Sequence, residues 1–363
     1  MIFLVNNSTE TYFFPIFLMN YKRDMGPFAI LMLTVEMLCF MLGIILTIRG
    51  CMVISETRVF NRNLNYILCT ILLQFFENVI GRLLIMPYQK GWILLPGNDH
   101  TKIYSEFTTN TTSEMIIIEK TLWDVPYLFI GSVMLTHYMA FSVTCMIGIT
   151  FERSLATYWI NDYEKKDRPG VYIFAIVFIQ TFTALVAYSA WNLWLSVYIW
   201  LLTGILLLIV NFGLFGYIWY WNIRVHRIHD NSIMTQSKYT LQARFQAREN
   251  ARGLEFTRLA VIVITMALLF ECTIFVLQYY NFFQEYEIFL YYAIDWVNAG
   301  NTVAIVPLTV ALEPVWRRKF FGNIRHSCPK TSKSSAIVDV IKGSKTTDVD
   351  TEEYFSQLSK AWA

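Results

Sequence analysis

The sequence predicts an all-α membrane protein, a bundle of seven transmembrane helices with the N-terminus outside the cell and the C-terminus in the cytoplasm. Composition is the first reason, because hydrophobic residues make up 55% of the chain and charged residues only 15%, against about 25% charged in a typical soluble domain. Apolar stretches long enough to cross a bilayer are the second reason, and an uneven distribution of basic residues between the loops is the third. The formal net charge of +2 does not indicate nucleic-acid binding.

The apolar stretches set the predicted spans. A hydrocarbon core of about 30 Å requires about 20 helical residues, and a helix closes all its backbone hydrogen bonds within the segment. Residues 1–27 are expected to form an extracellular N-terminus, and residues 313–363 a cytoplasmic interfacial helix and a disordered tail. The predicted spans are residues 28–48, 64–86, 125–151, 171–191, 197–222, 256–283 and 287–312.

The loops determine the predicted orientation. One set of loops, together with the C-terminal tail, carries 23 basic residues, whereas the opposite set carries five. Basic residues accumulate on the cytoplasmic side, so the tail is predicted to be cytoplasmic. Two glycosylation sequons, at Asn7 and Asn110, then fall on the outer side, and both asparagines are candidate glycan acceptors.

Ionisable residues inside the predicted spans are the candidate ligand site. An isolated charge at this depth costs at least a few kcal/mol, so these residues should face the bundle interior, pair with one another or stay neutral. Arg82 is five residues from Glu77, which is about 140° around the helix, so it should snorkel outward or meet an acid from another span. Two interpretations stay open: a polar layer that fixes helix packing, or a ligand or cation site. The candidate residues are Glu36, Glu77, His137, Glu271 and Asp295.

Two groups of basic residues mark the predicted cytoplasmic end. Glu152 and Arg153 follow the third span, where an acid next to an arginine forms an ion pair that a partner can break. Arg244, Arg248 and Arg252 recur at every fourth position and would form one cationic stripe on a helix that leads into the sixth span. For Arg153 the alternative is a side chain that only snorkels at the interface, and for the stripe it is a face that contacts solvent or lipid headgroups.

Two segments of the sequence resemble a known family. Residues 151–170, FERSLATYWINDYEKKDRPG, and residues 239–254, YTLQARFQARENARGL, are similar to the nematode serpentine receptors of class epsilon (Sre). The resemblance implies a G-protein-coupled chemoreceptor with a seven-helix fold, located in the plasma membrane and in the sensory cilia of chemosensory neurons. It implies two partners, a small-molecule ligand and a heterotrimeric G protein, and it does not identify the ligand.

Other functional classes lack their usual sequence features. No nucleophile motif, phosphate-binding loop or dinucleotide fingerprint stands out, so no enzymatic activity and no cofactor are expected. His137 is the only histidine within a predicted span, so no metal site is expected. The alternative to a receptor is a transporter or ion channel that uses the buried acids, which would need a polar path connecting both faces. Membrane lipids are the other expected partner.

Overall fold

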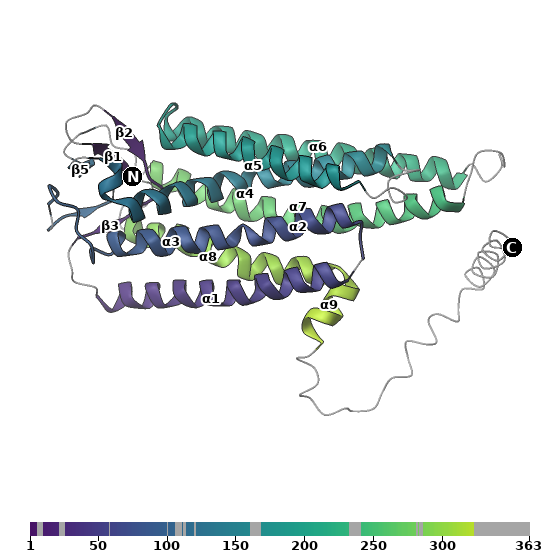
Figure 1. Ribbon diagram of the computed structural model, residues 1–363, viewed down its shortest axis with the longest axis horizontal. Coiled ribbons are helices and arrows are strands. Elements are labelled where there is room, and N and C mark those ends of the chain that lie inside the picture. Colours follow the sequence, from purple (N-terminus) through teal and green to yellow (C-terminus); the bar gives the residue numbers. More distant parts are fainter. Residues whose placement is uncertain are drawn as a thin grey trace, which may run out of the picture. The chain divides into compact units, whose positions relative to one another are not determined.

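In the computed structural model, long helices pack side by side, and two small sheets lie at one end of them (Figure 1). The structure describes residues 1–5, 10–21, 26–57, 59–99, 101–105, 111, 114–119, 121–159, 168–231, 241–280, 282 and 286–322, without the side chains of 225–251 and 287.

The helices follow the predicted spans and extend beyond several of them. Their bounds are α1 (Pro27–Glu56), α2 (Arg62–Leu73), α3 (Phe75–Gln89), α4 (Pro126–Tyr158), α5 (Pro169–Trp191), α6 (Val197–Asn231), α7 (Leu241–Tyr279), α8 (Glu287–Leu312) and α9 (Pro314–Phe321). Only Gln74 separates α2 from α3, so these two helices form one membrane-length segment.

Six helical segments of the described chain are long and apolar enough to cross a membrane. They are α1, α2 with α3, α4, α5, and the parts of α6 and α7 between Val197 and Arg224 and between Arg252 and Tyr279. The predicted seventh span is the 26-residue helix α8. It falls outside this set because polar residues, among them Asp295, Asn298 and Asn301, lower its mean hydropathy. The chain is therefore a helical membrane bundle with a more polar seventh helix.

Local sequence signals explain where the helices begin and end. Proline occupies the first turn of α1, α4 and α5, where its missing N–H leaves no hydrogen bond unmade. The Asn61 side chain caps α2 by accepting a 2.9 Å hydrogen bond from the backbone N–H of Asn63. Helix α8 ends just before Pro314, because the residue that precedes a proline, here Glu313, is disfavoured in helical conformation.

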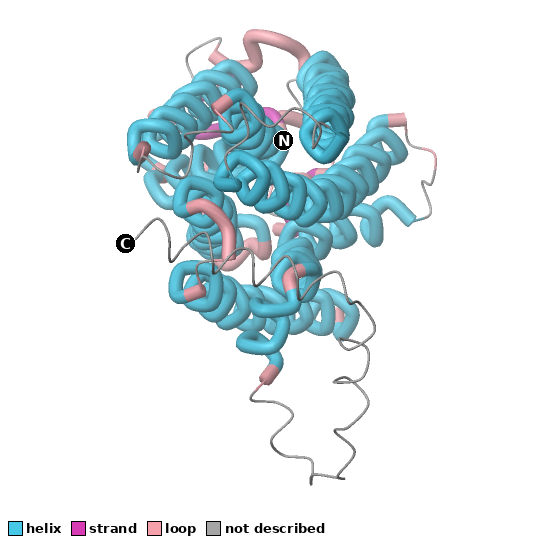
Figure 2. The backbone as a smooth tube through the Cα atoms, turned by 90° about the vertical axis from the view of Figure 1, so that its right-hand side faces the viewer, coloured by secondary structure: helices cyan, strands magenta, loops and turns pink. Residues whose placement is uncertain are grey.

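Helix α4 is the centre of the bundle. It packs against α3, α5, α6 and α7, while α1 packs along α8 at another side. Figure 2 shows these helices nearly end-on. Helices α5 and α6 are joined by a short turn, yet they scarcely touch each other, because α6 packs on α4 and α7 instead. This arrangement leaves space between α4, α5, α6 and α7.

Two glycines let α3 and α4 approach closely. A Cβ atom added to Gly81 would lie 3.0 Å from the carbonyl oxygen of Gly131, and a Cβ added to Gly131 would lie 2.8 Å from the carbonyl oxygen of Gly81. Small residues at facing positions bring two membrane helices into backbone contact. This close contact fixes the position of the neighbouring part of α3, including Arg82, along the axis of α4.

Strands at one end of the bundle depart from the all-α prediction. The first sheet has the order β2–β1–β5, in which β1 (Ile2–Val5) pairs antiparallel with β2 (Thr11–Phe13) and parallel with β5 (Ile116–Ile118). The second sheet pairs β3 (Met19–Asn20) with β4 (Ile103–Tyr104). A search for membrane-length apolar runs cannot find such short strands, although their β-branched and aromatic residues favour extended structure. We call this end of the bundle the strand end.

The strands attach the N-terminal segment to the helices at the strand end. Phe3, Phe14 and Ile116 are fully buried in a hydrophobic core that also contains Leu128 of α4 and Ile294 of α8. The N-terminal segment thus covers the strand end.

The opposite end carries α9, and we call it the α9 end. Trp316 and Phe320 of α9 are buried, whereas Arg317, Arg318 and Lys319 are exposed. The rings of Phe60, Phe256 and Trp316 contact one another at centroid distances of 5.0–5.3 Å. The predicted interfacial helix is therefore also anchored to the bundle through its apolar face.

Candidate functional site

A cavity of about 200 Å³ lies near the strand end of the bundle. Its wall consists of side chains from α4, α5, α6 and α7, with Asn298 of α8. Phe13, Pro15 and Phe17 of the N-terminal segment also line it. Phe17 packs edge-on against Phe275 of α7 at a ring distance of 5.0 Å. The cavity is thus lined by the N-terminal segment as well as by the helices.

Glu271 is the acidic side chain in this mostly apolar wall. It lies on α7 and is only 6% exposed. The side chain of Asn298 is its hydrogen-bonding neighbour. Glu271 has no basic partner among the described residues. Among the described lining residues, this carboxyl group is therefore the acid available to a bound molecule, beside several hydroxyl groups and the Asn298 amide.

Two other predicted acids lie together outside the cavity. Arg82 of α3 donates from Nε to Glu36 of α1 at 2.6 Å and from Nη2 to Asp295 of α8. All three side chains are at most 7% exposed. Gln89 adds a 3.3 Å hydrogen bond from Nε2 to Asp295. Of the two predicted possibilities for Arg82, the structure shows the second, pairing with acids from other spans.

Lys90 adds a second cation to this buried ion cluster. Its Nζ lies 4.7 Å from the ring centroid of Tyr292, and the residue is 5% exposed. Burial and the nearby Arg82 guanidinium lower the pKa of the Lys90 ammonium group, while the two acids oppose this shift. Glu36, Asp295, Arg82 and Lys90 together carry no net charge when all are ionised. A buried cluster with balanced charges is what we expect of a structural contact, and this one connects α1, α3 and α8.

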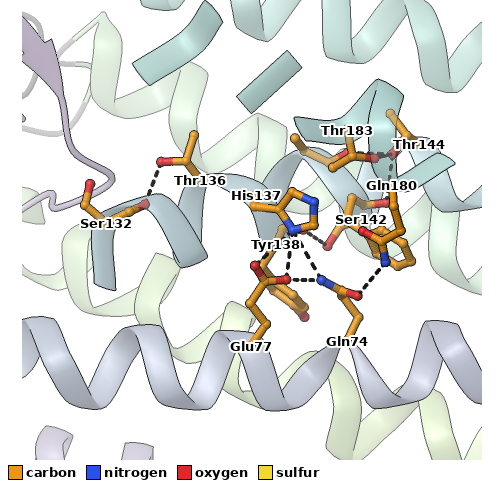
Figure 3. A network of polar contacts seen from close by, with 12 residues as sticks. Gln74, Glu77, Ser132, Thr136, His137, Tyr138, Ser142, Thr144, Gln180 and Thr183 are labelled. Carbon is orange, nitrogen blue, oxygen red and sulfur yellow. Dashed lines mark hydrogen bonds and ion pairs between the residues drawn. The ribbon is translucent and has the colours of Figure 1, made fainter. Parts of the chain in front are cut away.

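The remaining two predicted residues form a separate pair between α3 and α4. Nδ1 of His137 lies 2.9 Å from both carboxylate oxygens of Glu77. Gln74, at the junction of α2 and α3, donates to Glu77 and accepts a 3.1 Å hydrogen bond from Gln180 of α5. Figure 3 shows Gln74, Glu77 and His137 facing one another. This polar network ties α3, α4 and α5 together and does not line the cavity.

The predicted set thus divides among three places in the bundle. Glu36 and Asp295 belong to the ion cluster, Glu77 and His137 to the α3–α4 pair, and Glu271 to the cavity. Sequence reasoning did not find the lining residues Phe13 and Phe17. Their signal was the apolar run between Tyr12 and Met19, which is too short to cross a membrane.

At the α9 end, Glu152 and Arg153 form a buried, two-point ion pair. Arg153 donates from Nε to Glu152 Oε2 at 2.5 Å and from Nη2 to Glu152 Oε1 at 2.7 Å. Glu152 is fully buried and Arg153 is 3% exposed. A Cβ added to Gly253 of α7 would clash with the Arg153 guanidinium. Arg153 therefore lies buried between α4 and α7 and does not snorkel into the interface.

The three arginines of the predicted stripe all lie in α7. The Arg252 side chain is 45% exposed and donates to Glu313 at 2.6 Å. The side chains of Arg244 and Arg248 lie outside the described residues. The predicted glycan acceptors, Asn7 and Asn110, also lie outside them.

Long apolar helices packed side by side define a class, the multi-pass helical membrane proteins. The family model described as "Sre G protein-coupled chemoreceptor" matches residues 1–363, and so the chain belongs to the Sre family. This is a family of receptors and not of enzymes.

Three relatives from Caenorhabditis elegans share the whole length of the chain or nearly so. Serpentine receptor class epsilon-45 is 30% identical, with 100% of both chains covered. Serpentine receptor class epsilon-37 is 25% identical, also with 100% of both chains covered. Serpentine receptor class epsilon-38 is 26% identical over 98% of this chain and 99% of its own.

Proposed function

We propose that the protein is a chemosensory receptor that binds a small-molecule cue in the cavity near the strand end and activates a heterotrimeric G protein at the α9 end. The observation that carries the proposal is the cavity itself, about 200 Å³ in volume, with an apolar wall and one buried acid. Binding sites for small molecules are typically apolar, with a few polar groups that orient the ligand. Membership of the Sre family supports the same conclusion.

The orientation of the bundle is part of the proposal. The strand end faces outward and the α9 end faces the cytoplasm, because the basic residues concentrate in the loops and tail on the α9 side. This orientation places Asn7 and Asn110 where N-glycans are added, and it suits a receptor in the plasma membrane of sensory cilia. Antibody labelling of a tag within residues 87–124 on intact cells tests it. Labelling only after permeabilisation would contradict the orientation.

Helices α4 and α7 connect the cavity to the α9 end. On α7, Glu271 lines the cavity and Gly253 lies against the Arg153 guanidinium. These residues are 18 positions apart, which is about 27 Å along a helix. A cue that shifts α7 relative to α4 would thus change the surroundings of Arg153 and make its ion pair available to a partner. Receptors of this kind work by shifting a two-state equilibrium.

Two arginine variants test the coupling end. We expect Arg153→Ala, and separately the triple change Arg244→Ala, Arg248→Ala, Arg252→Ala, to reduce cue-dependent nucleotide exchange on a G protein by about tenfold. The reason is that arginines at the cytoplasmic mouth offer charge-assisted hydrogen bonds to the acids and carbonyls of a partner. The measurement is nucleotide exchange elicited by an active compound from a panel of small volatile and water-soluble molecules.

The controls separate coupling from folding. Surface amount and cue binding are measured on the same cells and should stay near wild type. Lys102→Ala removes one basic residue from the strand end and should leave exchange unchanged. Normal exchange at a normal surface amount in both arginine variants would remove these residues from the coupling site.

A further inference from the structure

The partners of the buried acids single out Glu271. Among the described residues, five acids are less than 9% exposed: Glu36, Glu152, Glu271, Asp295 and Glu313. Four of them have an arginine partner, which is Arg82, Arg153 or Arg252. Glu271 is the exception within the described chain. It is also the buried acid that lines the cavity near the strand end.

A lone carboxylate in an apolar wall is costly to keep ionised. Burying a charge without a partner is unfavourable, and a hydrogen bond to a neutral amide such as Asn298 offsets only part of the cost. A ligand that brings a positive charge to Glu271 would supply the partner that the other buried acids already have. An anionic ligand would instead place two like charges together.

The other wall residues fit an apolar body carrying a cation. Phe13, Phe17 and Phe275 present aromatic rings, and Tyr198 and Trp200 add two more. Aromatic faces attract cations as well as apolar groups. An apolar cavity of about 150 Å³ accommodates benzene, so a cavity of this size suits a ligand of about ten non-hydrogen atoms.

A bare metal ion fits the wall poorly. Hard cations take about six oxygen ligands, usually from several carboxylates and carbonyls. Among the described residues, no group of three or more His, Cys, Asp or Glu side chains is placed to hold a metal ion.

We propose that the cavity binds a small, mainly apolar amine, whose ammonium group pairs with the Glu271 carboxylate. This inference deepens the proposed function and rests on it in placing the cue in this cavity. The amine nitrogen donates to Glu271, and the hydrocarbon part fills the space between α4, α5, α6 and the N-terminal aromatic residues.

Matched ligand sets test the proposal. The full-length receptor in lipid nanodiscs is titrated with amines, alcohols and carboxylates built on the 2-phenylethyl, n-hexyl and cyclohexylmethyl groups. Dissociation constants come from the dependence of Tm on ligand concentration. In at least one set, the amine should bind about tenfold more tightly than its alcohol, because a charge-assisted hydrogen bond exceeds a neutral one. The carboxylate should bind most weakly. A wild-type receptor in which no amine binds more tightly than its alcohol overturns the proposal.

Variants identify the residue responsible. Glu271→Gln keeps the shape of the side chain and should abolish the preference for the amine, while the alcohol still binds. Glu77→Gln is the matched control, because Glu77 lies outside the cavity wall and pairs with His137, and it should retain the preference. An amine preference that survives Glu271→Gln would overturn the assignment to this carboxylate.

A third variant separates this inference from the proposed function. Gly204 of α6 lines the cavity, and a Cβ added to it meets no atom within 4 Å. Gly204→Phe should therefore fill the cavity and weaken binding of amine and alcohol alike. If Gly204→Phe has this effect but amines are not preferred, the cavity remains the binding site and only the ligand class is wrong. If an amine binds through Glu271 but never activates a G protein, the proposed function fails and the ligand class stands.

Discussion

At the scale of single residues, most buried charges of the described chain lie beside an opposite charge. Glu36 and Asp295 come from helices far apart in the sequence, and both contact Arg82. The sequence alone indicated that these residues should face the interior, pair with one another or stay neutral, because lipid excludes isolated charges. It did not indicate which acid meets which base, because pairing depends on how α1, α3 and α8 are rotated and aligned. The separation of Glu271 from the other acids was not predictable for the same reason.

Removing Arg82 tests the structural role of the cluster. We expect Arg82→Leu to lower the free energy of unfolding by about 3–5 kcal/mol, because it removes the guanidinium that contacts both buried carboxylates and leaves one nearby cation, Lys90, in place of two. Adding Glu36→Gln and Asp295→Asn to this variant should recover part of the loss. The measurement is thermal unfolding of the purified protein.

A surface pair provides the comparison for Arg82. Lys319 pairs with Glu56, and the two side chains are 43% and 58% exposed. Lys319→Met should cost less than about 1 kcal/mol, since exposed ion pairs contribute little. Equal losses for Arg82→Leu and Lys319→Met would show that the buried cluster does not link the helices.

At the scale of elements, the helices were predictable and their contacts were not. Six of the predicted apolar stretches coincide with segments of the described chain that are long and apolar enough to cross a membrane, and the seventh, 287–312, coincides with α8. The polar start of α7 was predicted as the helix that carries the arginine stripe, whereas the continuation of α6 to Asn231, past the predicted end at 222, was not predicted. The strands were missed because two to four residues give too little periodicity to recognise. The role of α4 as the central helix arises from packing and has no local signal.

The approach of α3 to α4 can be tested at its closest point. Gly131→Leu would drive a side chain against the Gly81 carbonyl and the side chains of Leu84 and Ile85. We expect a loss of about 1–3 kcal/mol in stability, the usual cost of overpacking, seen as a lower Tm. Gly216→Leu on α6 is the matched control, because a Cβ there meets no atom within 4 Å. A Tm for Gly131→Leu equal to that of the control would contradict the close packing of these helices.

At the scale of the whole molecule, the bundle places a cavity at one end and a buried ion pair at the other. Helices α4 and α7 contribute residues to both. Composition predicted the membrane class, and two sequence segments indicated the family. The family comparison confirms this resemblance. The cavity could not be predicted from the sequence, because its wall combines the N-terminal segment with five helices. Its position relative to Arg153 is the physical basis for the proposed signalling.

The most direct test of the account is to fill the cavity and measure signalling. Gly204→Phe places a phenylalanine side chain of α6 at the cavity wall. Its matched control, Gly213→Phe, places the same side chain on α6 away from the cavity. G-protein activation is recorded against a panel of small molecules, with surface amount measured on the same cells. The account predicts that Gly204→Phe reduces the potency of every active compound by at least about tenfold, whereas Gly213→Phe responds like the wild type. Unchanged potency in Gly204→Phe at a normal surface amount would contradict the claim that this cavity receives the cue.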